Sequence, residues 1–189
     1  MTTPAGHSLI GLAVFLATPA AGRKAALILL VLLMAAAFIP DIDLFPLLWG
    51  DLQGANNSHQ HFTHSLLFTA VVALALAFVA SKLGCGRFLH LSPYFIAAAW
   101  SHIFLDMLTE DTREPIGVEF FWPLSDARFS SPVSFFGGLA KSRMEDLLSW
   151  HNVQVVAGEI MVLAPLVVAV WLMRMWRIRR ARRIAQSSE

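Results

Sequence analysis

Five apolar segments constrain the fold of this 189-residue chain more than any other feature. They run from Ser8 to Ala21, Ala25 to Pro40, Ser65 to about Val79, Pro93 to Leu108, and Val153 to Trp176. A full membrane span needs about 20 residues, so only the fifth segment crosses comfortably, and the first four must be tilted or extended by interfacial residues. Since backbone groups in lipid must be satisfied within the segment or its bundle, we expect helices.

The composition agrees with this interpretation. A hydrophobic content of 57%, a charged content of 14% and a mean hydropathy of +0.62 exclude an ordinary soluble domain. We therefore predict an all-α, polytopic membrane helical bundle of about five apolar helices, with a long outer loop between the fourth and the fifth. A single membrane-embedded domain is expected over residues 1–176, followed by a basic cytoplasmic tail over residues 177–189. Cys85 is the only cysteine, which excludes a disulfide framework and a Cys-based zinc site.

The first apolar segment resembles the core of a signal peptide. However, no basic residue precedes it, whereas a signal peptide has a positively charged start. We expect the segment to be retained, which keeps His7 in the mature protein.

The charges predict an orientation. Ten of the fourteen basic residues lie in three places: Arg23, Lys24, Lys82, Arg87, Arg174, Arg177, Arg179, Arg180, Arg182 and Arg183. If all five segments cross, these places share one side, which the positive-inside rule makes cytoplasmic. Eleven of the thirteen acidic residues fall between Asp41 and Asp146, on the opposite side. We expect a multi-pass protein of the inner (cytoplasmic) membrane, with its C-terminus in the cytoplasm.

The arginine-rich tail has a second interpretation as a nucleic-acid patch. Juxtamembrane arginines more often set the topology and meet anionic lipid. Membrane lipid is therefore the expected partner, and no nucleic acid is expected.

Imidazole and carboxylate groups recur at the outer ends of segments that share no sequence similarity. They are His7, Asp41, Asp43, His59, His61, His64, His102 and Asp106. His102 and Asp106 are one helical turn apart and point the same way, and in an extended stretch Asp41 and Asp43 would share a face. Imidazole with carboxylate suits zinc, manganese or iron rather than calcium. The pattern predicts a metal site facing the periplasm or the exterior, with one or two divalent ions, zinc first and manganese second.

Each part of this pattern also has a simpler explanation. Asp41 could cap a helix or be a loop charge, His59 could be an exposed loop residue, and Ser65 is expected to cap the third helix. His102 and Asp106 could form a structural hydrogen bond between helices, although ionisable groups inside apolar segments are costly and usually functional.

The order of these motifs resembles the YdjM-type family of inner-membrane proteins, which are described as metal-dependent hydrolases. The resemblance rests on His7 with Gly11, Ile39-Pro40-Asp41-Ile42-Asp43, His61-Phe62-Thr63-His64-Ser65, Ser101-His102-Ile103-Phe104-Leu105-Asp106 with Thr109, and Phe121-Trp122-Pro123-Leu124-Ser125. A more distant likeness is to zinc-dependent phospholipase C, in which a His-x-x-x-Asp helix also joins earlier Asp and His residues. The later His-x-x-x-Glu pair of that family is broken here, because His151 and Glu159 are eight apart.

The leading hypothesis is a membrane-embedded, metal-dependent hydrolase in which the metal activates water and polarises an ester. The expected ligands are His7, Asp41, His64, His102 and Asp106; Asp43 and His61 come next, one of them as general base. Glu159 would either reach the metal site or pair with a histidine. A site at headgroup depth favours a lipid or lipid-linked phosphoester, although an acyl ester or amide is also open.

The alternative function is a metal-ion transporter or a metal-binding sensor. A transporter needs polar groups throughout the membrane. The middles of the second and third apolar segments contain no acid or imidazole, which favours a surface site.

Overall fold

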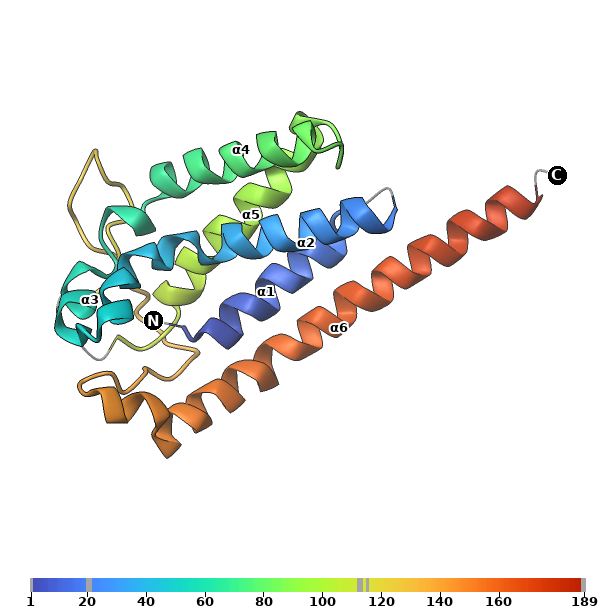
Figure 1. Cartoon of the computed structure of the whole chain (residues 1–189). Coiled ribbons are helices and arrows are strands. Elements are labelled where there is room, and N and C mark those ends of the chain that lie inside the picture. Colours follow the sequence, from blue (N-terminus) through green and yellow to red (C-terminus); the bar gives the residue numbers. More distant parts are fainter. Residues whose placement is uncertain (1, 20–21, 112–113, 115, 188–189) are drawn as a thin grey trace.

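Five apolar helices form the bundle of the computed structural model, which describes residues 2–19, 22–111, 114 and 116–187. They are α1 (Pro4–Ala17), α2 (Arg23–Phe38), α4 (Leu66–Lys82), α5 (Phe88–Met107) and α6 (Trp150–Ser187). Figure 1 shows α1, α2, α4 and α5 packed together, with the long α6 lying along α1. No strand occurs among the described residues, so the all-α prediction is confirmed.

Small side chains allow α2, α4 and α5 to approach closely. The buried core between these helices is formed largely by alanine, with a few large residues: Leu29, Leu33, Ala36, Ala37, Ala73, Ala77, Ala80, Phe95, Ala98 and Ala99. In a membrane, helix association depends on such close packing, because lipid tails are as apolar as the side chains themselves. The core between these helices is therefore formed mainly by small apolar side chains.

Three helical stretches are long and apolar enough to cross a membrane: Arg23–Trp49, Phe88–Met107 and Trp150–Ser187. The sequence predicted only the last of these, because two helices continue beyond their apolar runs. The 3-10 helix η1 (Ile39–Trp49) extends α2, and α5 begins five residues before Pro93, which lies inside the helix. The α1 and α4 helices are shorter, as expected, and the predicted end of the first segment at Ala21 lies outside the described residues.

The two ends of the bundle differ in character. At one end lie the α1–α2 and α4–α5 connections and the C-terminal part of α6, on or beside which ten of the fourteen basic residues occur (Figure 1). At the other end lie the N-terminus, η1, α3 (Leu52–Ser58), η2 (Phe62–His64) and the loop between α5 and α6. The α6 helix continues without interruption across the predicted boundary at residue 176. The division into a domain and a tail stays a prediction.

The loop between α5 and α6 folds back onto the ends of the helices. The backbone N–H of Leu66, at the start of α4, donates to Phe120 O, and that of Phe135 donates to Leu108 O. The 3-10 turn η3 (Met144–Leu148) then leads into α6. The loop thus closes the bundle at the end that carries the acidic residues.

Candidate metal centre

Seven ionisable side chains meet at the end of the bundle where the α5–α6 loop lies, and we call them the His/Asp cluster. They are His7, Asp41, Asp43, His59, His64, His102 and Asp106. The first turn of α1 supplies one histidine, η1 supplies two aspartates, α3 and η2 supply a histidine each at their ends, and the last turns of α5 supply the final pair. Separate parts of the chain therefore converge on one place.

The centre of the His/Asp cluster is a ring of alternating nitrogen and oxygen atoms. His102 Nε2 lies 3.3 Å from Asp41 Oδ1 and 3.5 Å from Asp106 Oδ2. His64 Nε2 lies 3.4 Å from the same Asp106 oxygen and 3.9 Å from Asp41 Oδ1. Hydrogen bonds between nitrogen and oxygen are usually about 2.7–3.2 Å long. Two ligands that bind one tetrahedral ion at about 2.1 Å lie about 3.4 Å apart, which is close to the spacing observed.

These atoms are buried and have no hydrogen-bond partner among the described residues. The same holds for further atoms around them, and the full set is His7 Nδ1 and Nε2, Asp41 Oδ1, His59 Nε2, His64 Nε2, His102 Nε2 and Asp106 Oδ2. Leaving one buried polar atom unsatisfied costs about 1–3 kcal/mol, and folded proteins contain few such atoms. Their convergence on one point, with donor types that suit a divalent cation, fits a metal ion.

His7 lies directly against the ring of ligand atoms. Its imidazole stacks on that of His102, with ring centroids 3.6 Å apart and planes 6° from parallel. His7 Nε2 is 3.5 Å from Asp106 Oδ1, the other oxygen of the carboxylate that contacts His64 and His102. The two oxygens of Asp106 therefore face different ligand groups: Oδ1 faces His7, and Oδ2 faces His64 and His102.

Two groups of three residues could each hold an ion. His7, His102 and Asp106 form one group, and each offers an atom within 4.8 Å of the others. Asp41, His59 and His64 form the second group by the same measure. Each group could hold an ion, and the number of ions stays a prediction.

Asp43 points away from the ring of ligand atoms and contacts the Nδ1 atoms of two histidines, on the side of each imidazole opposite Nε2. Its Oδ1 lies 2.8 Å from His59 Nδ1, and its Oδ2 lies 3.2 Å from His64 Nδ1. The Thr63 hydroxyl and the Gln60 N–H donate to the same Oδ2, at 2.6 Å and 3.1 Å. Carboxylates that receive the second N–H of an imidazole in this way orient metal-binding histidines and make them more basic.

The different roles of Asp41 and Asp43 follow from the local backbone. We expected an extended stretch in which alternate residues share a face, and this was wrong, because η1 is a 3-10 helix. Because a 3-10 helix has three residues per turn, the side chains of residues two positions apart point in different directions. Asp41 therefore faces the ring, and Asp43 faces the outer sides of the imidazoles.

The orientation of His102 is fixed from within the bundle. Its Nδ1 lies 2.7 Å from the carbonyl oxygen of Ala37, near the end of α2. A carbonyl can only accept, so Nδ1 carries the proton of the neutral imidazole, and Nε2 presents its lone pair to the ring. His102 is fully buried, in agreement with a preset orientation.

The backbone at Gln60 separates the two neighbouring histidines. Gln60 has a φ of 66°, a left-handed conformation that is uncommon for a residue other than glycine. His59, before it, is 3% exposed and belongs to the His/Asp cluster, so its expected alternative as an exposed loop residue does not hold. The His61 side chain is 40% exposed and contacts Glu119 Oε1 at 2.6 Å and the Asn57 carbonyl oxygen at 3.0 Å. The structure does not bring His61 into the cluster.

The environment shifts the pKa values of His59 and His64, the two cluster histidines that lie outside the long helices. Burial lowers the pKa of His59 below its ordinary value, although the hydrogen bond to Asp43 opposes this. Burial also disfavours the charged form of His64, but its contacts with Asp106 and Asp43 outweigh that effect and raise its pKa. A proton and a metal ion would thus compete for the same nitrogen lone pair of His64.

Glu159 differs from both roles expected for it. It is buried and binds the start of α1: Oε1 accepts from the Thr3 N–H at 2.7 Å, and Oε2 accepts from the Gly6 N–H at 3.1 Å and from the Thr3 hydroxyl. One residue earlier, the Thr2 N–H donates to Asp106 Oδ1 at 2.7 Å. Glu159 therefore anchors the N-terminal segment that supports the cluster. Sequence reasoning missed this, because its partners are mostly backbone groups.

These features define a class: an all-helical membrane protein with a buried His/Asp cluster that could hold a metal ion at one end of its bundle. The model of the YdjM inner membrane protein family matches residues 1–180, so the chain belongs to the YdjM family. The family resemblance expected from the motifs is thereby confirmed.

A curated relative supports the same assignment. The chain is 29% identical to "Inner membrane protein YbcI" of Escherichia coli (strain K12) over 125 residues, which is 66% of this chain and 70% of that protein. No solved structure matches the chain. The family and this relative place the protein in the inner membrane.

Proposed function

We propose that this protein is a membrane-bound, metal-dependent hydrolase that cleaves a phosphoester of a lipid or lipid-linked substrate. The observation that carries the proposal is the set of buried, unpartnered nitrogen and oxygen atoms spaced at ligand distances. A purely structural network would pair these atoms with each other, since an unsatisfied buried group is costly. Hydrolysis itself is inferred from the donor set and from the descriptions of families that the motifs resemble.

In this proposal the residues of the His/Asp cluster divide into ligands and supports. His7, Asp41, His64, His102 and Asp106 hold one or two divalent ions, with zinc preferred and manganese as the alternative, and His59 joins them as a sixth candidate. A bound ion supplies Lewis acidity, which activates water and polarises the ester. Asp43 keeps His59 and His64 in position, while a general-base role for Asp43 or His61 stays a prediction.

A lipid substrate is supported by the surface around this end of the bundle. Exposed aromatic and aliphatic side chains surround it, among them Phe45, Leu48, Trp49 and Trp150. Large aromatic residues collect where a membrane meets water, so these side chains suit the headgroup region. A site at this depth would meet lipid headgroups. We propose that it faces the periplasm or exterior, with the basic end and the C-terminus in the cytoplasm.

The bundle core argues against the transporter alternative. Directly below the His/Asp cluster, α2, α4 and α5 are packed with buried apolar residues such as Leu33, Ala77 and Phe95. An ion pathway requires polar groups at successive depths. The buried imidazole and carboxylate groups of the described residues instead lie toward one end of the bundle, which favours a site at the membrane surface.

The experiment is a phospholipid hydrolysis assay with the purified, metal-loaded full chain in mixed micelles. Labelled phospholipids of different headgroups are supplied, and released headgroup phosphate and released fatty acid are measured separately, which distinguishes phosphoester from acyl-ester cleavage. Asp106→Asn should abolish product release, and His90→Ala, at an exposed histidine of the opposite end, should not change it. Inactivity of the metal-loaded parent toward every headgroup class, or unchanged activity of Asp106→Asn, would contradict the proposal. Zinc flux into proteoliposomes would favour the transporter.

A further inference from the structure

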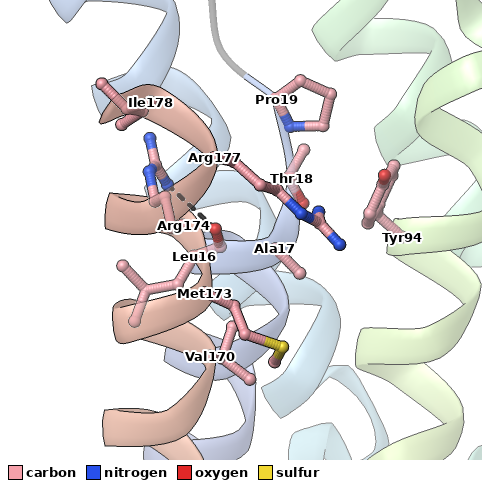
Figure 2. Close-up of a pocket in the computed structure, with 10 residues that line it drawn as sticks. All are labelled: Leu16, Ala17, Thr18, Pro19, Tyr94, Val170, Met173, Arg174, Arg177 and Ile178. Carbon is pink, nitrogen blue, oxygen red and sulfur yellow. Dashed lines mark hydrogen bonds between the residues drawn. The ribbon is translucent and has the colours of Figure 1, made fainter. Parts of the chain in front are cut away.

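A cavity of about 400 Å³ lies at the basic end of the bundle, opposite the His/Asp cluster. It is bounded by the end of α1, by α5 and by α6, as Figure 2 shows. The lining residues that the argument uses are Thr18, Tyr94, Val170, Met173, Arg174 and Arg177. Its volume is within the range of small-ligand sites.

Two arginines give the cavity its charge. Figure 2 shows the Arg177 side chain extending from α6 across the cavity, toward Thr18 of α1 and Tyr94 of α5. Arg174 donates from Nη1 to the carbonyl oxygens of Phe15 and Leu16, at 3.3 Å and 3.2 Å. Both bonds use one of the three guanidinium nitrogens, so the planar fork keeps further donors. No acidic residue is among the described residues that line the cavity, which is therefore suited to an anion.

The remaining surfaces suit an amphiphilic anion better than a free one. Val170 and Met173 of α6 contribute apolar surface to the cavity wall. On the same stretch of α6, Leu166, Trp171 and Leu172 are exposed and would face lipid in a membrane-embedded bundle. Hydroxyl and guanidinium groups thus lie beside an apolar helix face, the combination that a phospholipid presents in complementary form.

We propose that this cavity binds the phosphate headgroup of an anionic phospholipid, with its acyl chains along the exposed face of α6. Guanidinium groups match phosphate oxygens geometrically and form charge-assisted hydrogen bonds to them. Basic pockets between transmembrane helices bind anionic headgroups in this way. A bound lipid would join α6 to α1 and α5 at the end where the α6 helix projects beyond them. The proposal does not depend on the metal centre.

The test is a lipid titration of the delipidated full chain in detergent, read by native mass spectrometry. The parent should retain phosphatidylglycerol at least about fivefold more strongly than phosphatidylcholine of the same chain length. Arg177→Gln should weaken phosphatidylglycerol retention about fivefold, as expected for one basic residue at a membrane surface. Arg177 is exposed, so the variant should fold, which circular dichroism verifies.

Arg182→Gln is the matched control. It removes the same charge from the exposed part of α6 that projects past the cavity, and retention should stay close to that of the parent. Equal losses in the two variants would show diffuse attraction and overturn the proposal, as would equal retention of the two lipids. If glycerophosphate without acyl chains displaces the lipid at equal concentration, the ligand is a free phosphate compound and the lipid proposal is also overturned.

Discussion

Asp41 and Asp43 are two residues apart and do different work, which shows how closely single residues determine this site. Asp41 presents Oδ1 to the ring of ligand atoms, while Asp43 uses both carboxylate oxygens on His59 and His64. Counting acidic residues in the sequence identifies both, but their roles depend on whether the backbone is extended or helical. The 3-10 geometry of η1 decides this, and it follows from how α2 continues past Pro40.

Removing the charge of Asp43 should weaken metal binding without removing a ligand. In the Asp43→Asn variant, one carboxylate oxygen becomes an amide nitrogen, which cannot accept from the N–H of His59 or His64. We expect zinc affinity to fall about 10- to 100-fold, the range typical for residues that orient ligands. Competition against a fluorescent chelator measures the change. Asp126→Asn, at an exposed loop position, should leave affinity unchanged, and equal affinities for all three proteins would contradict the orienting role.

Metal affinity should rise with pH across the neutral range. An imidazole binds metal through a lone pair that a proton otherwise occupies. Because contacts with Asp106 and Asp43 raise the pKa of His64, its proton competes with the metal even above the ordinary histidine pKa of 6.5. Lowering the pH therefore weakens binding, and metal uptake near neutrality should release protons. Calorimetry in buffers of different ionisation enthalpy measures this release, and uptake without proton release would contradict it.

His59 marks a limit of prediction at the residue scale. The sequence left open whether it is an exposed loop residue or a residue of the site. Its buried position depends on the positive φ of Gln60, and no glycine or asparagine at that position signals the turn. Neighbouring His61 looks equivalent in the sequence and lies on the surface instead.

At the scale of elements, the N-terminal helix α1 is fixed by a residue that is far away in the sequence. Glu159, on α6, receives the first backbone N–H groups of α1, and the residue before them binds Asp106. A Cβ atom on Gly6 would lie 2.7 Å from Glu159 Oε2, so glycine allows this close approach. The position of His7 therefore depends on α6, a helix from the other end of the chain.

Neutralising this carboxylate should loosen α1. Glu159→Gln replaces charge-assisted hydrogen bonds with weaker ones and brings a buried N–H₂ group against backbone donors. We expect a loss of about 2 kcal/mol in unfolding free energy, in the range for hydrogen bonds to charged groups. A lowered thermal unfolding midpoint in detergent measures it. Glu145→Gln, at an exposed position of η3, should leave the midpoint unchanged; if Glu159→Gln does the same, α6 does not anchor α1 in this way.

The helices themselves were largely predictable, whereas their ends were not. Hydropathy identified all five apolar helices, since lipid forces backbone pairing within each segment. It placed the start of α5 too late and missed η1, because both extend into polar or proline-containing sequence. The Ser65 cap of α4 was predicted correctly from residue type, and its side chain accepts from the Phe68 N–H.

At the scale of the whole molecule, the alternation of helices explains why the candidate ligands meet. Successive helices run in opposite directions, so ligands at the start of one and the end of the next reach the same end of the bundle. That convergence could be predicted from the sequence by placing polar residues relative to the apolar segments. The pairwise geometry of the cluster could not, because it depends on packing between α1, α2 and α5.

The central claim is that the His/Asp cluster binds metal, and elemental analysis of the purified full chain tests it most directly. After purification with zinc or manganese and removal of loose ions, the parent should contain one or two equivalents of metal per chain. His102→Ala and Asp106→Ala should lose most of it, and His90→Ala should retain it. A parent without bound metal, or undiminished metal in both cluster variants, would contradict the account.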